Sequence, residues 1–375
     1  SFLDAFKAGD AESHEFWQAL PHLVDPLVNL YQLYEVLKAA RAVRGAIEFE
    51  TVETKIIFDD AHKIREILPV ERNDAHRLIE ECMLAANVCA AKALTVHELP
   101  VLYRIHRGPK EEKMENLRAF LGPLGFVLPT RRAIRPEDLQ AILEQIQDRP
   151  DRHLIQTVML RSMGQAVYSP ENIGHFGLNY EEYAHFTSPI RRYPDLLVHR
   201  SIRFLIRSKI ESEHVSRVKA VKVLKKKEWL PYTDKQLVEL GESCSFRERR
   251  ADEATREVAA ALKCDYMTHH IGEEFEGVIS GVTAFGFFVE LQGIYIDGLV
   301  HVATLNNDYY HFDAVGHRLV GEATRTVFAL GQKVRVLVAK VNVDEKKIDF
   351  QLVHAYPIPK PVATAKPAAT KEAKE

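Results

Sequence analysis

Two adjacent arginines between two prolines form the densest chemical feature of this 375-residue sequence. Arg191 and Arg192 follow Pro189 closely, and Tyr193 separates them from Pro194. Because each proline fixes φ and removes a backbone donor, the arginines should lie on a stiff turn. The planar guanidinium group suits bidentate contact with a phosphate. The stretch therefore predicts a phosphate-binding turn. The alternative is an arginine pair that only ties the loop to nearby carboxylates.

A helix is expected directly after this turn. Pro194 suits the start of a helix, and Asp195 would lie in its positive first turn. Apolar residues then recur at helical spacing, at Val198, Ile202 and Leu205. This helix would bury one face and hold the two arginines at its amino-terminal end.

The local charge near these arginines departs from the charge of the whole chain. The formal net charge of −3 argues against a uniformly basic nucleic-acid binder. Residues 191–227, however, contain twelve Lys or Arg against three acids. Such segregation predicts a basic stripe for nucleic acid, and a solvated helix face is the alternative.

Length and composition indicate a globular protein of two or three domains, with 46% hydrophobic residues. The four cysteines, Cys82, Cys89, Cys244 and Cys264, form no CxxC pair, which suggests reduced thiols and a cytoplasmic location. No long apolar run and no signal peptide is evident, so neither membrane insertion nor secretion is expected.

Helical periodicity dominates the first two thirds of the chain, with short strands between the helices. Helices are expected at 15–44, 110–121, 136–147, 151–164 and 231–262, and from a cap at Asn73 through Ala90. Strands are expected at 46–51, 54–58, 63–70 and 102–107. Asp59 and Asp60 should form the turn between two of these strands.

The pattern changes at Gly272, where short strands replace helices. Residues 275–291 predict two strands joined through Ser280 and Gly281, and 294–300, 333–343 and 347–352 predict three more. Five such strands suit an OB-type barrel. After Val353 the chain is rich in Pro, Ala, Lys and Thr, which predicts a disordered tail.

Aromatic residues of this barrel are candidates for stacking on bases. Phe285 and Phe288 can lie on the open face while Phe287 and Val289 point elsewhere, provided that a local bulge breaks strict alternation. In the alternative, all of these phenylalanines belong to the barrel core.

Several segments resemble a known family. The stretch HFTSPIRRYPDL at 185–196, within a wider segment 174–200, resembles the signature of the ribonuclease II/ribonuclease R (RNB) family of exoribonucleases. Residues 277–301 resemble the S1 RNA-binding domain. The resemblance implies an α+β fold. Residues 1–265 would be the helix-rich carboxy-terminal part of an RNB catalytic domain, 272–353 a five-stranded OB-type (S1) β-barrel, and 354–375 a disordered tail.

The resemblance also implies roles for single residues. The family hydrolyses RNA from the 3′ end to nucleoside 5′-monophosphates, using Mg²⁺ held by aspartates. Arg191 matches the arginine that contacts the scissile phosphate, Phe49 the aromatic that stacks on the 3′-terminal bases, and Glu80 a glutamate that contacts the terminal ribose. The remaining implied RNA-binding residues are Arg192, Tyr193, Phe285, Phe288, His301 and Lys347.

The aspartate cluster of the family is not evident in this sequence. Its pattern is an Asp, a gap, then Asp-x-Asp-Asp. Asp59 and Asp60 echo only the end of that pattern, and Thr54, Lys55 and Ile56 stand where further acids are needed. Mg²⁺ is the cofactor that the family implies, but no metal ligands are expected here. The chain is expected to be the carboxy-terminal portion of such an enzyme.

Three functions remain open from the sequence: an exoribonuclease portion without its metal ligands, a non-catalytic single-stranded RNA-binding module, and an adaptor to the ribosome or RNA-degradation machinery. Phe49, Glu80 and Arg191 favour the first, because a pure binder needs no 3′-end pocket. The missing aspartates favour the second for this polypeptide. We expect a monomer that binds single-stranded RNA. We do not expect it to bind a membrane.

Overall fold

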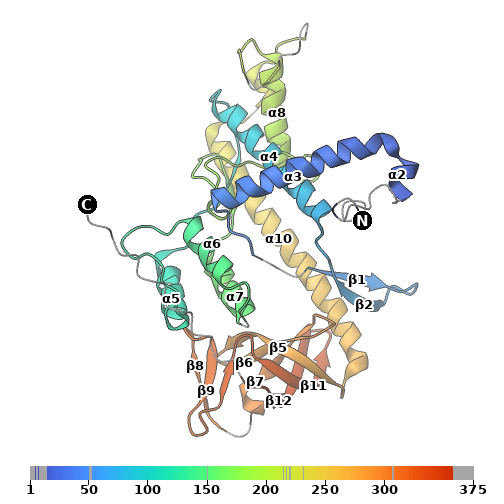
Figure 1. Cartoon of the computed structure of the whole chain (residues 1–375), viewed down its shortest axis with the longest axis vertical. Helices are drawn as coiled ribbons and strands as arrows, with labels where there is room; N and C mark the ends of the chain where they lie inside the picture. Colours follow the sequence, from blue (N-terminus) through green and yellow to red (C-terminus); the bar gives the residue numbers. More distant parts are fainter. Residues whose placement is uncertain are drawn as a thin grey trace.

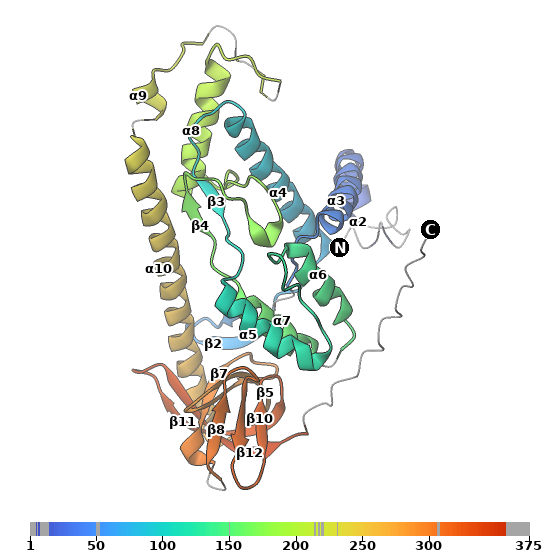
Figure 2. The same ribbon diagram turned by 90° about the vertical axis from the view of Figure 1, so that its left-hand side faces the viewer.

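The long helix α10, Asp234–Met267, runs along the molecule and ends beside a β-barrel, as Figures 1 and 2 show. Thr233 caps this helix by accepting a hydrogen bond from the backbone N–H of Gln236. The computed structural model describes residues 5, 7, 15–49, 53–149, 151–213, 215, 216, 218, 221–230, 232–305 and 308–357.

The other helices come before α10 in the chain. They are α2 Glu15–Ala19, α3 Val24–Arg44, α4 Asp74–Thr95, α5 Glu111–Leu121, α6 Pro136–Gln145, α7 Arg152–Ser162, α8 Tyr193–Arg207 and α9 Lys226–Trp229. Gly45 ends α3 in the left-handed region, with φ of 70°, as glycine readily does. Asn73 caps α4 by accepting from the N–H of His76. The predicted helix stop and helix cap are therefore both confirmed.

Two small antiparallel sheets, each of two strands, interrupt the helices. Strand β1, Thr54–Phe58, pairs with β2, Ile64–Pro69, and β3, Tyr103–Ile105, pairs with β4, Val167–Ser169. Oδ1 of Asp59 accepts hydrogen bonds from the N–H groups of Ala61 and Lys63, both at 2.9 Å, which confirms the predicted turn. Residues 46–49 were expected in a strand but belong to none, and 50–52 lie outside the described residues.

The carboxy-terminal strands close into the expected five-stranded barrel. Its strands are β5 Glu274–Thr283, β6 Gly286–Leu291, β7 Asp297–His301, β11 Lys333–Asn342 and β12 Lys347–Ala355. Their order around the barrel is β11-β12-β7-β6-β5. The mixed helix and sheet architecture agrees with the predicted α+β class.

Three details of the barrel differ from the prediction. The turn between its first two strands lies at Ala284 and Phe285, and Ser280 instead lies inside β5 at a shift in register. A small sheet, β8 Tyr310–Asp313, β9 Arg318–Gly321 and β10 Val327–Ala329, fills a segment that we had not divided into strands. Strand β12 runs past Val353 to Ala355. The predicted disordered tail from residue 358 onward lies outside the described residues.

One buried hydrophobic cluster joins the helices to the barrel. It includes Leu117 of α5 and Met159 of α7 together with Phe287 and Phe350 of the barrel. A direct bond also links the two parts, because Arg161 Nη2 donates to the carbonyl of Ser280 at 2.9 Å. None of the helices in the described ranges combines the length and apolar character needed to cross a lipid bilayer.

Candidate nucleic-acid interface

The Arg191 side chain is exposed on the turn that leads into α8. The backbone N–H groups of Arg191 and Arg192 donate to the carbonyl of Ser188, at 3.3 and 3.0 Å. Pro194 lies in the first turn of the helix, as expected. Within the described residues, the Arg191 side chain forms no hydrogen bond or ion pair. Its guanidinium group is therefore available to an anion from solution.

Arg192 and Tyr193, in contrast, both form side-chain hydrogen bonds within the protein. Arg192 Nη2 donates to Oδ1 of the fully buried Asp195 at 2.7 Å. The hydroxyl of Tyr193 lies 2.5 Å from that of Tyr232. Burial and this hydrogen bond raise the pKa of Tyr193 to about 12. Arg192 therefore ties the loop to a carboxylate, which was the alternative to phosphate binding. RNA contact by Arg192 and Tyr193 stays a prediction.

Two half-buried histidines lie in the loop that precedes the turn. The hydroxyl of Tyr168 lies 2.8 Å from Nδ1 of His185. Burial, followed by nearby positive charge, lowers the pKa of His185 to about 3 and that of His175 to about 3. Both imidazoles are therefore neutral at neutral pH. They act as packing and hydrogen-bonding groups and add no positive charge for a phosphate.

Asn87 on α4 also holds this loop, and we did not identify it from the sequence. Its Nδ2 donates to the hydroxyl of Tyr183 at 3.0 Å, and its Oδ1 accepts from the N–H of Phe186 at 2.8 Å. Asn87 is 2% exposed. The available signal was a polar residue among the apolar residues of an expected helix, because a buried amide requires partners.

Glu80 lies seven residues before Asn87 on α4, about two helical turns away and on the same face. It accepts a hydrogen bond from Arg41 Nη1 at 3.4 Å and is also paired with Arg72. A ribose hydroxyl would have to compete with these two arginines. The predicted contact of Glu80 with the terminal ribose stays a prediction.

Phe49 follows α3 in the chain. It lines a cleft of about 290 Å³ between α7, α10 and the barrel. In the same cleft, Lys263 Nζ donates to the carbonyl of Tyr295 at 2.7 Å. No contact among the described residues joins Phe49 to Glu80 or Arg191. These three predicted 3′-end residues are therefore not brought together by the described contacts.

Phe285 and Phe288 point away from the barrel core, as expected, but not because of a bulge between them. Phe287 and Val289 are fully buried, and Phe288 points to the other side of β6, so the strand alternates regularly. Phe285 is 49% exposed because it lies in the turn before β6. The bulge that we expected to break alternation is located in β5.

His301 and Lys347 are both exposed near the ends of barrel strands. His301 Nδ1 accepts from the N–H of Ala303 at 3.1 Å, and the ring lines an open groove of about 540 Å³ together with Asp349. Lys347 donates to Glu345 at 2.7 Å, and this bond raises the pKa of Lys347. Contact of either residue with RNA stays a prediction.

The predicted basic stripe lies on and after α8, at the opposite end of α10 from the barrel (Figure 2). Arg203 and Lys209 are exposed there. Arg200 instead donates through Nε to the carbonyl of Trp229 at 2.9 Å. Positions 214, 217, 219 and 220 lie outside the described residues. Some of the described basic side chains are thus exposed to solvent, whereas Arg200 is used in a hydrogen bond within the protein.

Comparison with known families agrees with this geometry. Residues 3–208 match the RNB domain, and residues 268–352 match the S1 RNA binding domain. This chain belongs to the RNB-domain family. The RNB match contains the Arg191 turn and α4, and the S1 match contains the five-stranded barrel up to Leu352 in its last strand.

Curated relatives of this RNB-domain chain carry the name Ribonuclease R. The protein from Vibrio cholerae is 52% identical over 351 residues, covering 92% of this chain and 41% of the relative. The protein from Escherichia coli K12 is 48% identical over 350 residues, covering 93% of this chain and 42% of the relative. The chain thus spans about two fifths of the length of these relatives.

Solved structures show the same fold. The apo form of Mycoplasma genitalium RNase R superposes with a TM-score of 0.76 at 24% identity, covering 88% of this chain and 50% of that one. The same protein in complex with ribose methylated single-stranded RNA gives a TM-score of 0.76 at 25% identity, with the same coverage.

The described part of this RNB chain does not fit a magnesium centre. Among the described residues, no three His, Cys, Asp or Glu side chains lie together in a group that could hold a metal ion. The carboxylate of Asp59 is engaged by two backbone N–H groups of its own turn. No metal-dependent step can therefore be assigned to the described residues.

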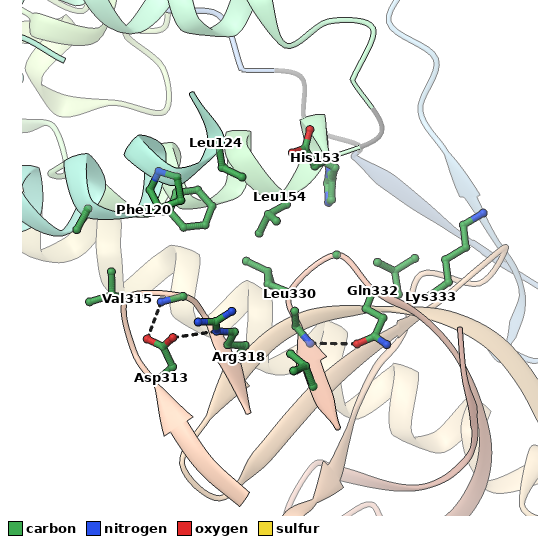
Figure 3. Close-up of a pocket in the computed structure, with 18 residues that line it drawn as sticks. Phe120, Leu124, His153, Leu154, Asp313, Val315, Arg318, Leu330, Gln332 and Lys333 are labelled. Atoms are coloured by element: carbon green, nitrogen blue, oxygen red, sulfur yellow. Dashed lines mark hydrogen bonds and ion pairs between the residues drawn. The ribbon is translucent and has the colours of Figure 1, made fainter. Parts of the chain in front are cut away.

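The RNB and S1 parts also enclose a groove of about 560 Å³ (Figure 3). Phe120 and Leu154 line it from the helical side, and Val315 and Leu330 line it from the S1 side. None of the residues predicted to bind RNA lines this groove. It separates the α5–α7 helices from the small β8–β10 sheet.

Proposed function

We propose that this chain holds RNA for a 3′→5′ exoribonuclease of the ribonuclease R type, which hydrolyses single-stranded or structured RNA to nucleoside 5′-monophosphates. The observation that carries the proposal is the exposed Arg191 on the turn of the RNB signature, whose side chain has no partner among the described residues. The same chain carries an S1 barrel that exposes Phe285. Support also comes from Mycoplasma genitalium RNase R, whose solved structures include complexes with single-stranded and double-stranded RNA.

The proposed division of work follows from chemistry. Phe285 and Phe288 would stack on bases with little preference for sequence, because every base has a π face. Exposed basic residues such as Arg203 would attract the backbone. Arg191 would contact the terminal phosphodiester and stabilise charge that develops there during hydrolysis. Each of these groups can bind and orient RNA without a metal ion.

The Mg²⁺ dependence that the family implies is proposed for the whole enzyme, with ligands outside the described residues. For this chain by itself we propose binding without hydrolysis, because no three metal-ligating side chains gather in its described part. Single-stranded RNA is the proposed main partner, and the ribosome or RNA-degradation machinery is a further one. We propose a cytoplasmic, monomeric protein, consistent with its unpaired cysteines.

A comparison of RNA topologies tests the proposal. Linear RNA with a 3′ hydroxyl should bind more tightly than a circular RNA of the same sequence, because only the linear form has a 3′ end. Fluorescence anisotropy measures both dissociation constants. The Phe285→Ala variant should weaken binding of both RNAs equally. Arg191→Ala should reduce only the preference for the linear form. Equal affinity of the wild-type chain for the two RNAs would contradict a 3′-end site.

A further inference from the structure

We propose that Asp195 is a positioning residue that fixes Arg191 for its phosphate contact. The inference rests on the function proposed above and adds a residue to it. Asp195 lies in the first turn of α8 and is 0% exposed. Its Oδ1 accepts two hydrogen bonds, from the N–H of Ser188 and from Nη2 of Arg192, both at 2.7 Å.

These two bonds close the turn from both sides. Ser188 enters the turn and Arg192 leaves it, so a single carboxylate oxygen joins the two ends. The carbonyl of Ser188 also accepts the N–H groups of Arg191 and Arg192. Outside this closed ring of bonds stand Ile190 and Arg191, whose side chains are exposed. A loop fixed in this way presents its guanidinium group in one geometry before RNA arrives.

The distribution of charge favours the same arrangement. Within the described residues, Asp195 is the sole acidic partner of Arg192. The amino-terminal turn of α8 stabilises a negative charge at this position. His185 is close enough to Arg192 to feel its charge, but burial first, and then Arg192, lowers the pKa of His185 to about 3. His185 therefore stays neutral and adds no positive charge beside Arg192.

The Asp195 cluster contains three buried polar atoms without a partner among the described residues. Oδ2 of Asp195, Nε of Arg192 and Oγ1 of Thr187 are all buried without a hydrogen-bond partner among the described residues. Folded proteins rarely leave buried polar atoms unpaired, and the exceptions concentrate at functional sites. Asp195 and Arg192 thus hold the turn although each keeps one buried polar atom without a partner among the described residues.

The test uses the Asp195→Asn variant of the chain and two RNAs. Asparagine can still accept from Ser188 N–H but removes the charge that Arg192 faces. The RNAs differ only in the last internucleotide linkage, which is either a phosphodiester or an uncharged methylphosphonate. The neutral linkage should weaken wild-type binding about tenfold, as expected for one lost charge-assisted contact. Arg191→Ala should abolish this discrimination. Asp195→Asn should abolish it too, with no further effect in the double variant.

Controls separate positioning from general damage. Asp151→Asn breaks a comparable part-buried pair with Arg149, at 2.7 Å, away from the turn, and should keep the tenfold discrimination. Thermal melting shows whether each variant is folded. If Asp195→Asn does not fold, Arg192→Gln breaks the same pair from its other side and should lose the discrimination.

Two results would overturn the inference in distinguishable ways. Discrimination that depends on Arg191 but survives in folded Asp195→Asn, or in Arg192→Gln where that variant replaces it, would reject the role of Asp195 and leave the proposed function intact. A wild-type chain that does not discriminate between the two linkages would reject the proposed phosphate contact and the positioning role together.

Discussion

The rings of Phe285 and Phe288 meet edge to face, with centroids 6.3 Å apart and planes at 88°. Phe287, which lies between them in the sequence, points into the barrel and is fully buried. Of these three rings, therefore, only the outer two can stack on a base. These three phenylalanines thus divide into an outer pair on the barrel surface and one core residue.

Substitutions of these phenylalanines should separate binding from stability. Phe285→Ala should weaken single-stranded RNA binding by ~1–3 kcal/mol, because one stacking surface is lost. Phe287→Ala should instead lower the free energy of unfolding by ~3–5 kcal/mol, because it leaves a cavity in the core. Anisotropy and thermal melting measure the two effects. Unchanged RNA affinity in Phe285→Ala would remove this ring from the interface.

The S1 barrel should fold when it is expressed alone. The segment 268–357 should be more stable than the segment 272–353. The longer segment keeps Tyr356, whose carbonyl accepts from Gln332 Nε2 at 2.8 Å and whose hydroxyl donates to Glu276 at 2.8 Å. Each lost hydrogen bond typically costs about 1 kcal/mol. The shorter segment should therefore melt several degrees lower. A disordered product from 268–357 would show that the barrel depends on its packing against α5 and α7.

The sequence predicted elements whose signals are local. Gly45 and Asn73 mark helix ends through backbone conformation and capping, and Pro194 marks the start of α8. The turn at Asp59 was predictable because an aspartate accepts bonds from its own following N–H groups. Each of these features is decided by a few neighbouring residues, so periodicity and residue type suffice to find them.

Features that depend on long-range contacts were not predictable in this way. Ser280 and Gly281 suggest a turn by composition, but pairing of Ile279 and Gly281 with β6 continues β5 through this point. Arg191 and Arg192 look equivalent in sequence, yet the buried Asp195 engages only the second. The cleft that Phe49 shares with α7, α10 and the barrel likewise depends on how distant segments pack, which no local pattern records.

Stability should fall as the pH is lowered from about 6.5, because two half-buried histidines resist protonation. In the folded chain the pKa of His175 and of His185 is about 3, against the ordinary histidine value of 6.5. Between these values the unfolded chain binds more protons, so each histidine lowers the free energy of unfolding by about 1 kcal/mol for each pH unit of acidification. Above pH 6.5 this contribution to the slope disappears.

Denaturant titrations between pH 6.5 and 5 measure this slope before most carboxylates titrate. His185→Gln should reduce the slope by roughly one proton equivalent, even if the variant is less stable overall. His311→Gln serves as the matched substitution on the surface, because that side chain is 63% exposed. An identical slope in wild type and His185→Gln would contradict the neutral, buried state of His185.

Arg191 should matter more for turnover than for affinity in a complete enzyme that combines this chain with a metal centre. Contacts that strengthen as charge shifts at the phosphate act on the transition state. Arg191→Ala should lower the single-turnover rate by ~10²–10³-fold. Arg191→Lys should restore little, because the planar fork is lost. Near-normal single-turnover rates in either variant would exclude Arg191 from the chemical step.

The chain itself should bind single-stranded RNA without degrading it. If ~4 or 5 phosphates are neutralised, the logarithm of affinity should fall with the logarithm of salt concentration at a slope of about −3. Hydrolysis should be absent, because orientation by Arg191 cannot replace a metal that lowers the pKa of water from ~15.7 to about 7. Within the described residues the nearest echo of the family motif, Asp59 and Asp60, forms a turn. Incubation with 3′-labelled RNA and Mg²⁺ measures the outcome. Release of monophosphates that Asp59→Asn and Asp60→Asn together abolish would show that this turn binds the metal.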